Sequence, residues 1–577
     1  MRNSRVKVQK KKRKKITRAD LNVFESEPSS KGKGIAVKKK AKSKKKEYAS
    51  VLNIMKHMSP FEVKDILIQE AKKTAKKRKA TMLNAGRGNP DFLNTTVRDA
   101  FSLLCMFVTD CSNRYLKQKN LGLRPDKKGL ARKFFQFLNK QKKSESRLFL
   151  EKAMRYAIKT FKYDADAFIF EMTDAALGDF YPMPPRVFPF MEKILRAYID
   201  QILYLSPKMK KTKCDLFCTE GATAAMIYIF NSLKLNGLLR KGDEIAIITP
   251  IFSPYLEIPL LDEFKLKEVF IESDEDLEWQ IPDKELKKLE NPKVKALFLV
   301  NPANPTSVAL HPHVIKKIGQ IVRNKRKDLI VLTDTVYATF VNKFYCLLDE
   351  VPDNTICVYS YSKYFGVTGW RLGFIMMSQN HVIDKLLKKL PQKQKKILYD
   401  RYRMIHPDPN NMSFIDRLET DSRHEALAHT GGLSCPQQAI MTLFSLFNLM
   451  DKKQKYKDDV HQILVKRMKY LFHNLEMKMP KEKGNTYYYV LLDFIDIAEQ
   501  KYGKPFAKYL EKNVHLLEFL YRLAQEKMTI CLPGEGFHGP DWSLRVSLAN
   551  LHDNDYKAVG KNLNDMLKIY YNEWKKG

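Results

Sequence analysis

Seven short apolar runs lie between residues 214 and 378, and each ends in polar, glycine or proline residues. The runs are DLFCTEG, EIAIITP, KEVFIES, VKALFLVNP, DLIVLTD, TICVYSYS and RLGFIMMS. Most are separated by stretches with the apolar spacing of amphipathic helices, as at Met226, Ile229, Phe230 and Leu233. Buried strands that alternate with helices favour an α/β domain whose mostly parallel seven-stranded sheet is covered on both faces.

Polar segments follow several of these runs directly. Ligands of such sheets bind beyond the carboxyl ends of the strands, so we expect the segments to meet at one edge. They are TEGATAAM (219–226), TPIFSPY (249–255), NPANPTS (301–307), TDTVY (333–337) and SYSKYFGVTGWR (360–371), and the C-terminal part adds RVSLA (545–549).

Two charged residues in these segments have competing interpretations. Asp334 follows the apolar run LIVLT, and a buried carboxylate is unfavourable without a cation, so it is either a partner for a bound cation or a helix N-cap. Lys363 is either a reactive amine or one more cation among 103 lysines and arginines.

The net charge of +38 is unevenly distributed, because VQKKKRKKITR and AVKKKAKSKKKEY lie within the first fifty residues. Such a tail is typical of a solvated disordered segment, a nucleic-acid or nuclear-import patch, or a tether to an anionic surface. Charge alone does not separate these alternatives, so contact of the tail with nucleic acid stays open.

Changes of pattern along the chain predict five parts. We expect a basic disordered tail at 1–50, an N-terminal helical part of the small domain at 51–150, and the large cofactor domain at 151–390. An inserted helical segment at 391–430 and a smaller α+β domain at 431–577 complete the chain.

The composition excludes several classes of protein. Eight cysteines without CxxC spacing indicate reduced core residues rather than a disulfide framework, and no metal site is expected. No apolar stretch reaches the roughly eighteen residues that span a bilayer, so we expect a cytoplasmic protein without membrane contact.

Taken together, the strand-end segments resemble the fold type I pyridoxal 5′-phosphate enzymes of the aspartate aminotransferase superfamily. The resemblance rests on S-x-S-K with an arginine eight residues after the lysine, preceded by D-x-x-Y and N-P-x-N-P-T, and covers roughly residues 80–577. Two positions depart from the family pattern: Ala222 and Ser307 each stand where a glycine is usual.

The resemblance implies roles at the cofactor ring. Lys363 would condense with the cofactor aldehyde and then carry a proton, and Asp334 would pair with the pyridinium nitrogen. Tyr337 and Asn304 would bind the phenolic oxygen, and Phe252 would stack on the ring unless it only packs in the core.

The same resemblance implies a phosphate cradle at the start of a helix, where backbone amides meet an anion. The residues implied are Gly221, Ala222, Thr223, Ser360, Ser362 and Arg371. Tyr181 matches the tyrosine that reaches the phosphate of the neighbouring subunit, which implies a homodimer with shared sites and allows a larger homo-oligomer.

Length and further segments narrow the resemblance to the aspartate 4-decarboxylase branch. It implies release of the β-carboxylate of L-aspartate as CO2 to leave L-alanine, with aminotransfer to a 2-oxo acid as a side activity. Arg545 would bind the α-carboxylate, its alternative being a salt-bridged surface arginine. Arg87, between Gly86 and Gly88, would meet substrate at the mouth of the site, its alternative being a solvated turn.

Two other functions remain open on the sequence alone. One is a plain aminotransferase for aspartate or another amino acid, because the sequence does not determine how the reaction divides between decarboxylation and transamination. The other is a nucleic-acid-binding or regulatory protein that retains an aminotransferase-like domain, although the first eighty residues lack a convincing helix-turn-helix pattern.

Overall fold

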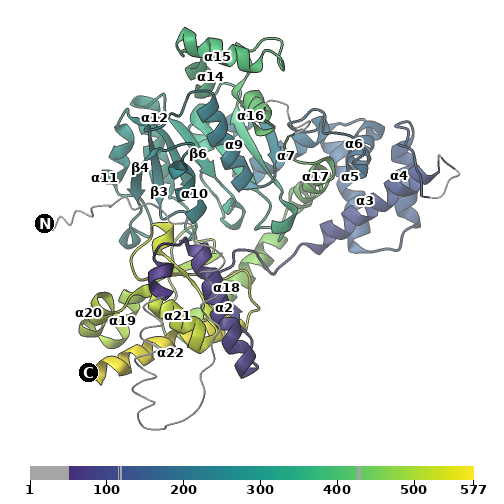
Figure 1. Cartoon of the computed structure of the whole chain (residues 1–577). Helices are drawn as coiled ribbons and strands as arrows, with labels where there is room; N and C mark the ends of the chain where they lie inside the picture. Colours follow the sequence, from purple (N-terminus) through teal and green to yellow (C-terminus); the bar gives the residue numbers. More distant parts are fainter. Residues whose placement is uncertain (1–50, 115, 117–119, 425–430, 577) are drawn as a thin grey trace, which may run out of the picture. The chain divides into compact units, whose positions relative to one another are not determined.

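The computed structural model describes residues 51–114, 116, 120–424 and 431–576. The chain divides after His57, and residues 58–577 form one unit that holds both main sheets and the helices packed on them (Figure 1). The basic tail expected at 1–50 lies outside the described residues.

A seven-stranded sheet forms the centre of this unit. Its strand order is β2-β8-β7-β6-β5-β3-β4, and only β8 runs antiparallel to its neighbours. The strands are β2 (Cys214–Thr219), β3 (Glu244–Thr249), β4 (Lys267–Glu272), β5 (Val294–Val300), β6 (Ile330–Asp334), β7 (Thr355–Ser360) and β8 (Gly373–Ser378). Each of the seven apolar runs forms one strand, so the predicted α/β class and mostly parallel sheet are confirmed.

Helices cover the sheet on both faces, as the strand period of two requires. On β5, the ring of Phe298 lies 5.6 Å from that of Phe230 on α9 (Ala222–Leu235). Leu297 and Leu299 point the other way and share a buried cluster with residues of α12 (Pro312–Asn324). In Figure 1 the strands accordingly run between α12 on one side and α9 on the other.

A group of helices precedes the sheet in the chain. It comprises α3 (Thr95–Asn113), α4 (Leu130–Lys140), α5 (Glu145–Phe161), α6 (Ala165–Leu177), α7 (Pro189–Ile202) and α8 (Pro207–Lys211). Helices α3, α5, α6 and α7 pack on α17 (Cys435–Met450), seen beside α3 and α5 in Figure 1. The range expected as the helical part of the small domain therefore contributes mostly to this group, and the predicted domain boundaries remain predictions.

The C-terminal elements build a second layer around a three-stranded antiparallel sheet of order β11-β12-β9. The strands are β9 (Tyr489–Asp493), β11 (Leu532–Pro533) and β12 (Ser543–Ser547). The helices are α18 (Lys455–Leu475), α19 (Phe494–Tyr502), α20 (Lys504–Asn513), α21 (Leu516–Lys527) and α22 (Asp555–Lys575). From the other end of the chain, α2 (Pro60–Arg78) packs on α21, and β1 (Leu83–Asn84) pairs with β10 (Thr529–Ile530).

Short helices complete the unit. They are α10 (Ser253–Glu257), α11 (Asp283–Leu286), α13 (Leu347–Glu350), α14 (Val382–Lys388), α15 (Gln392–Tyr402) and α16 (Phe414–Ser422). Among the described helices, none is both long enough and apolar enough to cross a membrane. All eight cysteines are unpaired, as expected.

The close approach of β8 to the start of α9 gives a test of the packing. A Cβ atom on Gly373 would lie 2.8 Å from the Cα atom of Gly221 and 2.8 Å from the carbonyl oxygen of Tyr359. Both neighbours are backbone atoms, so Gly373→Ala should destabilise the fold by about 1–3 kcal/mol and lower Tm in differential scanning calorimetry. Gly369→Ala is the matched control, because its Cβ would meet no atom within 4 Å, and an equal loss in both variants would contradict this explanation.

Candidate active site

A cavity of about 280 Å³ lies at the carboxyl ends of the parallel strands. Its lining brings together segments that are hundreds of residues apart in the sequence. Predicted site residues in the lining are Ala222, Thr223, Phe252, Asn304, Asp334, Tyr337, Ser360, Ser362, Lys363, Arg371 and Arg545. Further lining residues are Gly88, Asn89, Tyr255, Val300, Val336, Thr368 and Tyr489.

Lys363 enters the cavity from the turn after β7. Its Nζ atom donates a hydrogen bond to the carbonyl oxygen of Gly88 at 3.0 Å. Tyr488 donates its hydroxyl to the same oxygen at 2.8 Å. An amine held by one neutral acceptor at the edge of a cavity remains available to a ligand, which is what a reactive lysine needs.

Asp334 is the last residue of β6 and is almost fully buried. Its carboxylate accepts hydrogen bonds from the Tyr255 hydroxyl at 2.8 Å and from the Val336 amide at 2.9 Å. Burial raises the pKa of Asp334 to about 6, although both hydrogen bonds and the nearby Lys363 act in the opposite direction. Within the described residues no cationic side chain lies within 4 Å of it, so the negative charge is available to a cation in the cavity.

The first turn of α9 forms the opposite end of the site. Helix-start amides have no acceptor within their own helix, and the helix dipole favours an anion there. Gly221 precedes this turn at φ +86°, where a Cβ atom would come 2.8 Å from Nη2 of Arg371. Arg371 donates from Nη2 to the Glu220 carbonyl at 2.9 Å and from Nη1 to the Thr368 carbonyl at 3.0 Å. The amides of the first turn of α9 and the guanidinium of Arg371 thus lie close together at this end of the cavity.

Two serines adjoin this end of the cavity. Ser360 donates its hydroxyl to Ser362 at 2.9 Å, and both line the cavity. The Ser360 hydroxyl also lies 3.1 Å from the Leu372 carbonyl, so the Ser362 hydroxyl is the one that can turn to donate to an anion placed between it and the amides of α9.

Arg545 lies on β12 and is almost fully buried. It donates from Nη1 to Asn304 Oδ1 at 3.1 Å and from Nη2 to the Gly86 carbonyl at 2.8 Å. Its guanidinium carbon lies 4.4 Å from the ring centre of Tyr489. Burial lowers the pKa of Arg545, its Nε atom has no hydrogen-bond partner among the described atoms, and no described carboxylate lies within 4 Å. A buried cation of this kind is suited to a carboxylate ligand.

Tyr337 was predicted to be in the site, but its neighbour Tyr489 was not. The hydroxyls of Tyr337 and Tyr489 lie 3.0 Å apart, and burial raises the pKa of Tyr337. Strand β9 begins at Tyr489, and the ring of Tyr488 directly before it lies 4.9 Å from that of Tyr489, so both tyrosines pack beside Tyr337. Tyr255 and Gly88 were missed as well, because nothing local in the sequence shows that they meet Asp334 and Lys363.

Three predicted residues are outside the lining. Gly221 lies directly behind it, against Arg371. Arg87 is exposed on the loop whose flanking carbonyls, at Gly86 and Gly88, accept from Arg545 and Lys363. Tyr181 is 62% exposed in the connection between α6 and α7. Arg87 therefore lies next to residues that contact the site without lining the cavity itself, whereas Tyr181 presents its ring outward.

Comparison with known families matches residues 181–563 to aminotransferase class I and II. The chain belongs to this family. A bifunctional aspartate aminotransferase and L-aspartate beta-decarboxylase from a Pseudomonas species is 42% identical over 85% of this chain and 93% of that protein. An aspartate aminotransferase from Pyrococcus abyssi is 36% identical over 30% of this chain and 43% of its own length.

Solved structures of aminotransferases share the fold. The aspartate aminotransferase of Thermus thermophilus with maleate has a TM-score of 0.55 at 15% identity, covering 89% of this chain and 98% of that one. The aromatic aminotransferase of Pyrococcus horikoshii gives 0.53 at 18% identity, covering 85% and 96%. The predicted aminotransferase-like fold is confirmed.

Class I and II aminotransferases use pyridoxal 5′-phosphate, and the cavity fits this cofactor. The buried carboxylate of Asp334 suits a ring nitrogen that carries a proton, and the cradle at Gly221 and Arg371 suits a phosphate group. Lys363 lies between these two ends and suits an aldehyde. The individual roles of these residues stay predictions.

Titration of Asp334 gives a test that needs no turnover. A carboxyl group whose pKa is raised by folding stabilises the protein at low pH, and that contribution disappears as pH rises through about 6. In cofactor-free protein, Asp334→Asn should therefore gain Tm relative to wild type as pH rises from about 4 to about 6, by a few degrees, and the difference should stay constant above about pH 7. Asp349→Asn serves as the control, and a Tm difference independent of pH would show that Asp334 is not held in an unfavourable charged state.

Proposed function

We propose that the protein releases the β-carboxylate of L-aspartate as CO2 and leaves L-alanine, with amino transfer from aspartate to a 2-oxo acid as a second outcome. The match to the bifunctional Pseudomonas protein carries this proposal, because it extends over 85% of the chain rather than over the cofactor segments alone. The cavity also supports the proposal, because Arg545 offers a cationic site for a carboxylate and Lys363 offers an amine.

Bound pyridoxal phosphate supplies an electron-withdrawing ring, and the chain supplies position and proton transfer. Lys363, at 3.0 Å from the Gly88 carbonyl, is the base that takes the proton from the substrate Cα atom. After CO2 has left and Cβ has taken a proton from solvent, the same amine returns a proton to Cα. Before substrate binds, the Gly88 carbonyl orients this amine in the cavity.

Arg545 receives the α-carboxylate of the substrate. Its guanidinium is held by Asn304 and the Gly86 carbonyl, and Tyr489 lies against it, so its orientation is set before substrate arrives. Pairing with a carboxylate would satisfy the free Nε atom and balance the buried charge.

The β-carboxylate needs a weaker anchor than the α-carboxylate does. Negative charge leaves that group as CO2 forms, and a strong buried cation would stabilise the substrate more than the transition state. Arg87 is exposed and flanked by Gly86 and Gly88, so it can meet this group in solvent without holding it rigidly.

A homodimer in the cytoplasm completes the proposal. The exposed ring of Tyr181 supports an approach to the cofactor phosphate of a second subunit, as the family resemblance implies. Larger assemblies would be built on the same dimer.

The product of aspartate turnover tests the proposed reaction. Purified holoenzyme incubated with L-aspartate alone, without a 2-oxo acid, should release CO2 and alanine over many turnovers. Carbon dioxide can be trapped and alanine quantified by chromatography. Lys363→Ala should form neither product and should lose the visible absorption of the lysine-bound cofactor.

A plain aminotransferase would give a different result in this experiment. It would consume about one equivalent of aspartate per site, form oxaloacetate, and stop until a 2-oxo acid is added. That outcome would refute the decarboxylase proposal and favour the alternative.

Replacement of Arg545 tests the α-carboxylate site. Loss of one partner of a buried charge pair typically costs about 2–5 kcal/mol, so Arg545→Ala should raise the aspartate KM by roughly 30-fold or more. The absorption of the bound cofactor should change little. Arg545→Lys, which keeps the charge without the forked geometry, should be intermediate, and an unchanged KM in both variants would place the α-carboxylate elsewhere.

A further inference from the structure

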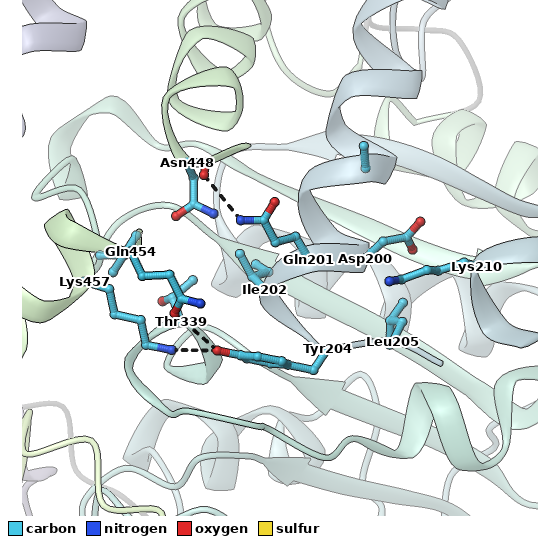
Figure 2. A pocket seen from close by; sticks show the side chains of 12 residues that line it. Asp200, Gln201, Ile202, Tyr204, Leu205, Lys210, Thr339, Asn448, Gln454 and Lys457 are labelled. Atoms are coloured by element: carbon cyan, nitrogen blue, oxygen red, sulfur yellow. Dashed lines mark hydrogen bonds between the residues drawn. The ribbon is translucent and has the colours of Figure 1, made fainter. Parts of the chain in front are cut away.

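A second cavity, of about 560 Å³, lies beside the first and shares no lining residue with it. Its walls come from α7 and the segment after it, from the end of α17, and from the start of α18 (Figure 2). Thr339 and Tyr364 close one side. The volume is within the range of small-molecule sites.

Lys457 is the distinctive residue of this cavity. The side chain is 8% exposed, and Nζ donates to the Val341 carbonyl at 2.7 Å and to the Tyr204 hydroxyl at 3.2 Å. Both acceptors are neutral, and within the described part of the chain no carboxylate lies within 4 Å of Nζ. Burial lowers the pKa of Lys457 to about 8, so the ammonium still carries its charge at neutral pH without a counter-ion.

Neutral polar groups surround this ammonium. Gln201 donates to the Asn448 carbonyl at 3.3 Å, and the Tyr204 hydroxyl lies 3.5 Å from Gln454 Oε1. Both distances are at the long limit for a hydrogen bond, so these amides and the hydroxyl are weakly engaged. Figure 2 shows them grouped around the end of the cavity that holds Lys457.

The carboxylate at the opposite end is already paired, and the lysine beside it is exposed. Asp200 pairs with Arg196 at 2.8 Å, and Lys210 lies beside it in Figure 2. Ile202 and Leu205 give that end an apolar surface. The cavity is therefore polar and cationic at one end and has an apolar wall at the other.

We propose that this cavity binds a small carboxylate anion, with the carboxylate paired to Nζ of Lys457 and hydrogen-bonded by Tyr204 and the amides of Gln201 and Gln454. Of the two lysines in the lining, Lys457 is the buried one, and one buried ammonium balances the one negative charge that a monocarboxylate carries. A phosphate group carries between one and two at neutral pH and would leave excess negative charge in a half-buried site. The apolar wall fits a short carbon chain.

The site adjoins the catalytic cavity without being part of it. Tyr364 directly follows Lys363, and Thr339 comes two residues after Tyr337. Its occupant would therefore lie behind the backbone that carries the catalytic lysine, and Arg545 would play no part in holding it.

Calorimetric titration with butyrate, a monocarboxylate with a short carbon chain, tests the proposal on the holoenzyme. The expected result is that Lys457→Met binds one butyrate fewer per chain than wild type does. Lys455→Met is the matched control, since it removes the same charge from an exposed position on the same helix, and it should bind as many as wild type. This difference holds whether or not the Arg545 site also takes butyrate, so it is independent of the proposed reaction.

A second variant guards against misfolding of Lys457→Met. Ala197→Leu narrows the cavity without altering any charge and should also lose one bound butyrate per chain. Equal numbers of bound butyrate in wild type, Lys457→Met and Ala197→Leu would overturn the proposal.

Discussion

Two buried charges of opposite sign face one cavity, and among the described residues neither has a counter-ion within 4 Å. Asp334 ends a central strand of the large sheet, and Arg545 lies on a strand of the C-terminal sheet. Each is surrounded by neutral hydrogen-bonding groups that orient it without neutralising it. Burial of unpaired charge is unfavourable in itself, so both side chains are suited to ligands of opposite charge that enter between them. The rest of the site is arranged around this constraint.

Much of this architecture could be predicted from local sequence. Continuous apolar runs of strand length with helical patterns between them allow few alternatives to a parallel α/β sheet, and the polar residues just after them must then meet at one edge. Asp334 and Lys363 were found in this way. Strand β6 ends at Asp334, and β7 leads into the turn that holds Lys363. These strands are neighbours in the sheet, so the topology alone brings the two residues together.

Contacts between distant segments could not be predicted in the same way. Gly88 accepts from Lys363 across 275 residues, and Tyr489 meets Tyr337 across 152. Neither pairing leaves a local pattern. Ser307 shows the same limit: it stands where the family usually has glycine and adopts φ +66°, and its hydroxyl accepts a hydrogen bond from the Tyr489 amide at 2.7 Å. That bond helps to offset the backbone strain and places Tyr489, and neither effect can be predicted from a motif.

Helix α18 connects the surroundings of the two cavities. Lys457 is near its start, and ten residues further on Arg467 holds Asp91 through two hydrogen bonds, at 2.8 and 2.9 Å. Asp91 belongs to the loop that carries Arg87 and Gly88 over the active site. Ten helical residues span about 15 Å of rigid rod. One rigid stretch of α18 therefore carries both Lys457, in the second cavity, and Arg467, which holds the loop over the catalytic cavity. A shift of this stretch along the helix axis at one cavity would displace the residue at the other.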